Sequence, residues 1–248
     1  FGGRGHQFPP GTVRPSAAVA ICEGTGTHLS NAKIVATAGG TFTGWISTLG
    51  VATRGGFNVN TASRQPRGTL DLAAMDSCDI DIVNLLVAPG LGMPEALGSD
   101  IGVLRLPPGT ATVSTAVIGA VDGAGSGVLS FSNTVMSVTN AITIRATGSV
   151  TARIDTTPSG LAIANSDDEA FVVVPGGTLT LDFCAPHMVR PHYGFKWQGD
   201  HLASVLEMID DGRIVIETTG LNREVDAFRR DGATMIGLRN TGTMFMLR

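Results

Sequence analysis

Short apolar runs recur along almost the whole chain, and this feature most restricts the folds open to it. Clear examples lie at 33–38, 81–88, 101–106, 111–121 and 170–174, with turn-forming residues between them. Most runs alternate apolar with polar residues or are rich in β-branched residues, which is typical of strands. The sequence therefore predicts a mainly β protein. We find no fixed-period repeat, which argues against a solenoid.

Composition favours many short strands joined by tight turns. The 248 residues include 33 glycines, and only 15% of them are charged. The net charge is −4 and the Lys and Arg residues form no cluster, so nucleic acid is excluded as a primary partner. No segment approaches the roughly 18 consecutive apolar residues of a membrane-spanning helix. We therefore expect no insertion into a membrane.

Three segments differ in their patterns. Residues 1–16 are rich in Gly and Pro without apolar periodicity, which predicts an extended N-terminal arm. Residues 17–184 carry most of the apolar runs and are expected to form the main β domain. Residues 185–248 are expected to form a small α+β extension. Within it, an apolar face over 202–209 predicts a short helix, and the Asp-Gly pair at 211–212 predicts a turn into a strand.

Three further segments are similar, in order, to landmarks of the chymotrypsin-like serine proteases. The first is GTGTHLSNAKIVATAGGTF at 24–42, in which Thr37, Ala38 and Gly39 precede Gly40. In that family the equivalent motif ends in the histidine that serves as general base. The resemblance therefore places Gly40 at the position of the base. Because glycine accepts no proton, a serine hydroxyl would stay a poor nucleophile.

The other two segments supply the remaining positions of a catalytic triad. In VNLLVAPGLGMPEALGSDIGVLRLPPG, the resemblance assigns Asp100 to the triad aspartate. In IDTTPSGLAIANSDDEAFVVVPGG, it assigns Ser159 to the nucleophile, with Thr157 and Pro158 in place of the usual Gly-Asp. A β-branched Thr157 resists the backbone conformation that an oxyanion hole needs. The resemblance implies a double β-barrel with a vestigial site; a β-sandwich or jelly roll is the alternative fold.

Other residues that could carry chemistry fit structural roles. The three cysteines are widely spaced, which allows either one disulfide with a free thiol or three buried thiols. Three histidines near the C-terminal segment lack the spacing of a metal site, so we predict neither a metal nor a cofactor. These residues are Cys22, Cys78 and Cys184, and His187, His192 and His201.

Three local patterns allow further predictions. The glycine-rich stretch 119–127 and the acidic run 167–169 are both predicted to form hairpin turns. Tyr193, Phe195 and Trp197 alternate along the chain, so they can project from one side of a strand. Such a row is either part of the core or an exposed contact surface for protein or glycan.

Three functions remain open on this sequence. The first is a catalytically inactive protease-like protein with a binding or structural role. The second is a structural protein of a virion or appendage, suggested by low charge, the N-terminal arm and a start at Phe1 that is typical of maturation. The third is an active serine hydrolase whose base is restored, or supplied by His28 or a partner chain. The first two predict a protein partner or self-assembly, and an extracellular or virion location is favoured.

Overall fold

The computed structural model describes residues 18–23, 31–53, 66–90, 100–121, 125–155, 159–184, 193–218 and 224–238. These residues form strands, one 3-10 helix (η1) and one α-helix. In chain order the elements are β1 (Ala18–Glu23), β2 (Asn31–Val35), β3 (Thr41–Thr53), β4 (Arg67–Asp71), β5 (Ser77–Val87), β6 (Ile101–Leu106), β7 (Gly109–Ile118), β8 (Ser126–Ser132), β9 (Thr134–Ile144), β10 (Gly148–Ile154), β11 (Gly160–Ile163), η1 (Asp168–Ala170), β12 (Phe171–Val173), β13 (Thr178–Phe183), β14 (Tyr193–Gln198), α1 (Leu202–Asp210), β15 (Ile214–Glu217), β16 (Val225–Arg230) and β17 (Ala233–Leu238).

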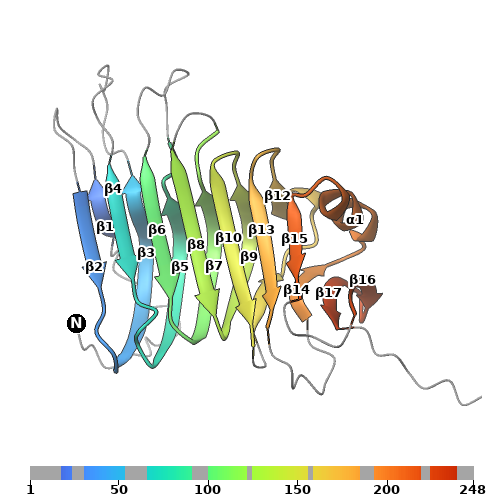
Figure 1. Cartoon of the computed structure of the whole chain (residues 1–248), viewed down its shortest axis with the longest axis horizontal. Coiled ribbons are helices and arrows are strands. Elements are labelled where there is room, and N and C mark those ends of the chain that lie inside the picture. The colour runs from blue at the N-terminus through green and yellow to red at the C-terminus, as the bar shows by residue number, and fades with distance from the viewer. Residues whose placement is uncertain are drawn as a thin grey trace, which may run out of the picture.

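Successive strands alternate between two sheets. From β3 to β11, each strand pairs in parallel with the strand two places before it. One sheet is wholly parallel, with the order β15-β13-β10-β8-β6-β4-β2. The other, which we call the mixed sheet, has the order β1-β3-β5-β7-β9-β11-β14-β17-β16, and β12 also pairs with β9. The chain therefore winds as a parallel coil, with β1 and β2 at one end (Figure 1).

This winding corrects two predictions. Neither sheet closes on itself in the part of the chain that the structure describes, so the double β-barrel is wrong. The alternative jelly roll is wrong too, because its strands would be antiparallel. The expectation that the chain is not a solenoid is also wrong, since each pair of strands is one turn of a coil. What the structure confirms is the mainly β class.

Stacked aliphatic side chains fill the space between the sheets. One column in the mixed sheet and one in the parallel sheet each place a buried aliphatic residue in nearly every turn of the coil. The first column is Ile21, Val51, Val87, Ile118, Ile144 and Val173. The second is Ile34, Leu70, Leu104, Leu129, Val150, Leu179 and Ile214.

A column of glycines explains how the two sheets come close at one edge. Gly68, Gly102, Gly127 and Gly148 occupy successive strands of the parallel sheet in register. A Cβ on Gly102 would lie 2.8 Å from the carbonyl oxygen of Val51, and the other three would also meet backbone atoms within 3 Å. The spacing between them falls from 34 residues (102 − 68) to 25 (127 − 102) and 21 (148 − 127). The coils therefore repeat in space without a fixed period in sequence.

The mixed sheet bends along a line of polar residues. In β5, Ile82 and Leu85 are buried while the two residues between them are exposed, and β3 has a similar interruption. The Asn84 side-chain amide donates to the Ser47 carbonyl at 3.4 Å. At the same bend further along, Asn165 donates to the carbonyl of Asn140 at 3.2 Å. These amides satisfy backbone groups where the ladder turns.

The last coils depart from the simple pattern. The predicted short helix is confirmed as α1, and the predicted turn at 211–212 leads into β15. Both sheets continue beyond residue 184, since β14 pairs with β11 and β15 pairs with β13. Strands β16 and β17 form an antiparallel hairpin closed by Asp231 and Gly232, both with positive φ, as a two-residue hairpin turn requires.

The two other hairpin predictions are wrong. Stretch 119–127 follows the end of β7 and contains the start of β8, and these two strands lie in different sheets. The acidic run 167–169 contains the start of η1, which separates β11 from β12. Both connections carry the chain around the coil rather than back along a neighbouring strand.

Candidate functional site

The structure separates Gly40 from Ser159. Gly40 immediately precedes β3, and Ser159 immediately precedes β11, in the same sheet. The register from Gly160 runs through Val135, Thr110 and Asp79 to Thr43, which is four strand steps. At 4.7–4.9 Å per step, this distance is about 19 Å. A base at position 40 is therefore far outside hydrogen-bond reach of Ser159.

Asp100 lies at another edge of the coil. It precedes β6 in the parallel sheet, next to Gly102, which packs on the backbone of Val51 and Ala88 where β3 and β5 end. Position 40 and Ser159 instead lie where strands of the mixed sheet begin. Asp100 is 2% exposed and Ser159 5%. The three positions assigned by the protease resemblance are not brought together, and His28, Thr157 and Pro158 fall outside the described residues.

His201 is the one histidine among the described residues, and it is held by contacts on several sides. Its ring stacks on Trp197 with centroids 3.6 Å apart, and its Nε2 lies 3.0 Å from the Gln198 carbonyl oxygen. Its backbone N–H donates to Thr234 Oγ1 at 2.9 Å. Nδ1 approaches an Asp168 carboxylate oxygen to 3.1 Å without hydrogen-bond geometry. His201 thus joins β14, α1, β17 and η1, which is a structural role; His187 and His192 lie outside the described residues.

The alternating aromatics are divided between core and surface. Phe195 and Trp197 are buried and contact Phe171, with ring centroids 4.9 and 5.5 Å away. Tyr193 is exposed. Of the two interpretations that the sequence allowed, core packing therefore holds for two of the three aromatics.

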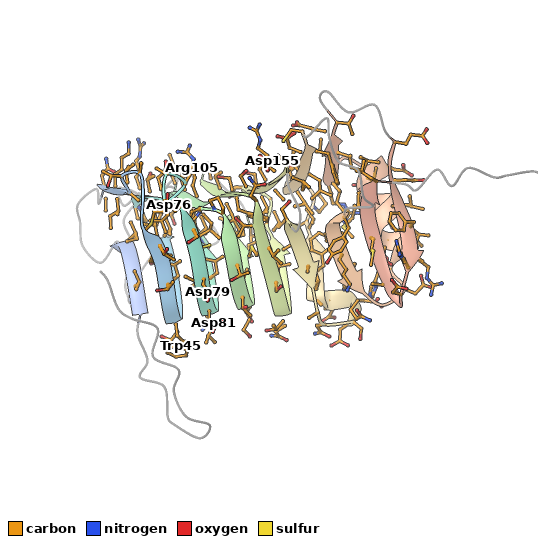
Figure 2. The ribbon with its side chains drawn as sticks, turned by 90° about the horizontal axis from the view of Figure 1, so that it is seen from below. Trp45, Asp76, Asp79, Asp81, Arg105 and Asp155 are labelled. Atoms are coloured by element: carbon orange, nitrogen blue, oxygen red, sulfur yellow. The ribbon has the colours of Figure 1, made fainter. Side chains whose placement is uncertain are left out.

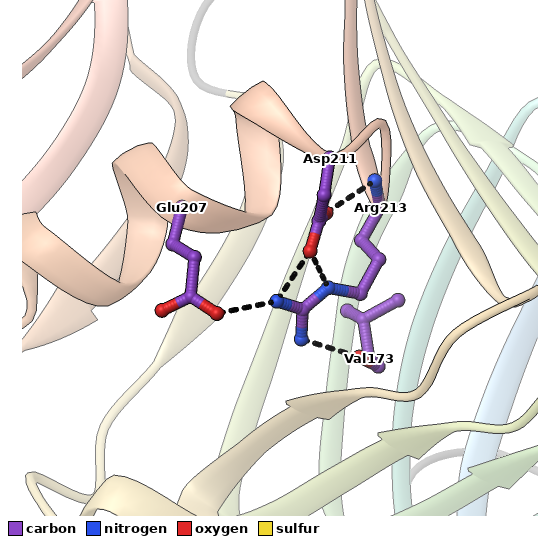
Figure 3. Close-up of polar contacts among 4 residues, drawn as sticks. All are labelled: Val173, Glu207, Asp211 and Arg213. Carbon is purple, nitrogen blue, oxygen red and sulfur yellow. Dashed lines mark hydrogen bonds and ion pairs between the residues drawn. The ribbon is translucent and has the colours of Figure 1, made fainter.

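Arg213 fastens α1 to the coil. Its guanidinium donates to Asp211 Oδ2 at 2.7 Å, to Glu207 Oε1 at 3.2 Å and to the Val173 carbonyl at 3.1 Å (Figure 3). The hydrogen bond from Arg213 lowers the pKa of Asp211 and raises that of Arg213. A pocket of about 330 Å³ lies beside this network, lined by residues 175–178 and 211–213. It presents mainly backbone and the Asp211–Arg213 pair, which neutralise each other.

The two described thiols differ in their surroundings. Cys78 is buried, and burial together with the charge of Asp79 raises its pKa to about 11. Cys184 is partly exposed, and its sulfur lies 3.2 Å from Arg153 Nε. Both thiols are free. A disulfide among the three cysteines would need at least one of these two, so the alternative of one disulfide with a free thiol is wrong. The side chain of Cys22 lies outside the described residues.

The outer face of the mixed sheet carries a polar surface that the sequence analysis did not single out. Figure 2 shows Trp45, Asp79 and Asp81 projecting from this face. Asp81 is opposite Trp45 in the ladder, and Asp79 accepts a hydrogen bond from Thr110 Oγ1 at 2.7 Å. In the sequence, the alternation of Asp79 and Asp81 with the buried Ile80 indicates that the two aspartates lie on an exposed face. Figure 2 places Asp76, Arg105 and Asp155 on the other side of the coil.

Two searches for specific sites gave negative results within the described ranges. No group of three or more His, Cys, Asp and Glu residues there could hold a metal ion. No helix there is long and apolar enough to cross a membrane.

No protein-family model, curated protein or solved structure matches this chain.

Proposed function

We propose that the protein is a catalytically inactive structural module of the virion or appendage type, which acts by binding protein partners. The observation that carries the proposal is the distribution of the three protease-like positions. Gly40 and Ser159 lie four strand steps apart in the mixed sheet, and Asp100 precedes a strand of the other sheet. Neither a base at position 40 nor the Asp100 carboxylate can then assist Ser159 in the way that a catalytic triad requires.

The architecture supports a structural role. Each coil buries its apolar residues only by stacking on its neighbours, so the coil is a continuous core with long outer faces. Threonine, serine and aspartate alternate with buried residues along those faces, as in β5 and β7. Such a stack is an extended scaffold whose ends and faces are available for assembly.

Covalent labelling with a fluorophosphonate probe tests this proposal. We expect no label on Ser159 by mass spectrometry, and no difference between the protein and its Ser159→Ala variant in peptide hydrolysis. Added imidazole should change neither result. The chain has no base at position 40, and its fold also keeps that position far from Ser159. Labelling of Ser159 that the alanine variant abolishes would instead support the active hydrolase.

A further inference from the structure

The edge strands at the two ends of the coil differ in their pairing and in their charge. At the C-terminal end, β17 adds antiparallel to β14 and β16 adds to β17. The outer strand β16 carries three charged residues, Asp226, Arg229 and Arg230, and charged residues on an edge discourage further pairing. The edge strands at the other end carry one each, Glu23 on β1 and Lys33 on β2. At the other end, β1 and β2 are the terminal strands of their sheets, each paired on one side among the described residues.

The apolar core extends to the open end. Ile34 is 49% exposed, yet it is the last member of a column whose next members, Leu70 and Leu104, are buried. Val35 beside it is 52% exposed. Two large apolar side chains on a five-residue edge strand are the pattern of a surface that another strand covers.

Backbone groups of β2 also point away from the coil. The Ala36 N–H donates to the Asp71 carbonyl at 2.7 Å, so this residue faces β4. Because pairing direction alternates along a strand, the N–H groups of Lys33 and Val35 face the open edge. An edge strand with outward N–H and C=O groups is a template for strand addition.

We propose that the end formed by β1 and β2 is the interface of a homodimer, in which the same end of a second copy meets it about a two-fold axis. This inference rests on the proposed structural function. A two-fold copy presents identical outward-facing backbone groups and identical apolar side chains, and an axis perpendicular to the strands makes the paired edges antiparallel. The fold already accepts antiparallel addition to a parallel edge, where β17 joins β14.

A second copy fits this end better in a head-to-head arrangement than in a head-to-tail one. In a head-to-tail stack, the open end would meet the end that β16, β17 and α1 occupy. There the mixed sheet ends in charged β16, and α1 packs against β15, the last strand of the parallel sheet. A head-to-head arrangement avoids both obstacles and buries Ile34 and Val35 of each copy.

Sedimentation equilibrium on the full chain, between about 1 and 100 μM, tests the interface. We expect a dimer whose dissociation constant rises at least about tenfold in Val35→Lys, because the charge enters the apolar seam. Lys33→Pro should have a similar effect, since it removes an N–H that faces the open edge and proline is tolerated on edge strands. The matched control is Val121→Lys, which changes a 67%-exposed valine between β7 and β8 and should leave the dimer intact.

Circular dichroism and thermal unfolding of each variant establish that the monomer is folded. If the Lys33→Pro variant does not fold, the Val35→Lys variant alone tests the interface. A wild-type protein that stays monomeric throughout, or a dimer that both edge variants leave unchanged, overturns the interface. Neither result would show a reactive Ser159, so the proposed structural function would stand. Labelling of Ser159 by the fluorophosphonate probe would overturn that function, whatever the oligomeric state.

Discussion

At the scale of single residues, Cys78 shows how the coil changes the chemistry of a side chain. Its sulfur lies 3.5 Å from the Pro107 carbonyl oxygen and 3.6 Å from that of Thr110, in the turn between two coils. Burial disfavours the thiolate first, and the neighbouring charge of Asp79 adds to the effect. The sequence identified a cysteine, but its burial depends on how β5 packs in the coil, where its neighbour β7 is 31 residues further along the chain.

We expect Cys78 to make stability depend on pH in the alkaline range. Its pKa is raised from 9.0 to about 11, so the folded state holds the proton more tightly than the unfolded state. The stabilisation is complete below about pH 9 and is lost as the pH rises towards 11. Urea unfolding at pH 8 and pH 11 should show a loss, on the order of 1 kcal/mol, that Cys78→Ala lacks. An equal loss in both proteins would contradict this assignment.

At the scale of elements, the glycine column sets the distance between the two sheets. Its members recur in register once per coil, although their spacing in sequence varies. In the sequence, these glycines appear as isolated residues of the kind found in turns. Only the pairing of β4, β6, β8 and β10 reveals a column, because a residue's neighbours across a sheet are distant in the chain.

Gly102→Ala should destabilise the protein by about 1–3 kcal/mol, since the new methyl group would press on backbone atoms that cannot rotate away. The two nearest are the Val51 oxygen at 2.8 Å and the Ala88 nitrogen at 2.9 Å. Thermal unfolding measures the loss. Ser130→Ala, on the outer side of β8, is the control and should be close to neutral. If both variants unfold at the same temperature, the glycine column does not set the sheet spacing.

At the scale of the whole molecule, stability should be greatest in the middle of the coil. Leu129 and Ile34 belong to one column, but Leu129 is fully buried with neighbours on both sides and Ile34 ends the column. We expect Leu129→Ala to cost about 2–5 kcal/mol in urea unfolding. Ile34→Ala, measured at a concentration where the protein is monomeric, should cost clearly less. Equal costs would mean that the open end is as well covered as the centre.

The sequence by itself determined the β class, the short helix at 202–210 and the turn that follows it. These depend on local patterns, namely period-two alternation, an apolar helical face and an Asp-Gly pair. It did not determine how the strands pair, because alternation looks the same in an antiparallel barrel and in a parallel coil. The protease-like segments around Gly40, Asp100 and Ser159 are also local strand patterns, and such patterns do not determine which strands pair.

Only the tertiary structure decided where those residues lie and which surfaces remain open. Pairing joins residues that are 36 positions apart between β3 and β5, 31 between β5 and β7 and 25 between β6 and β8, so no fixed period appears in the chain. Four parallel strand steps separate positions 40 and 159, where an antiparallel barrel would have brought them together. Among the described residues, the same winding makes β1 and β2 the terminal strands of their sheets, because each coil is completed only by the next one.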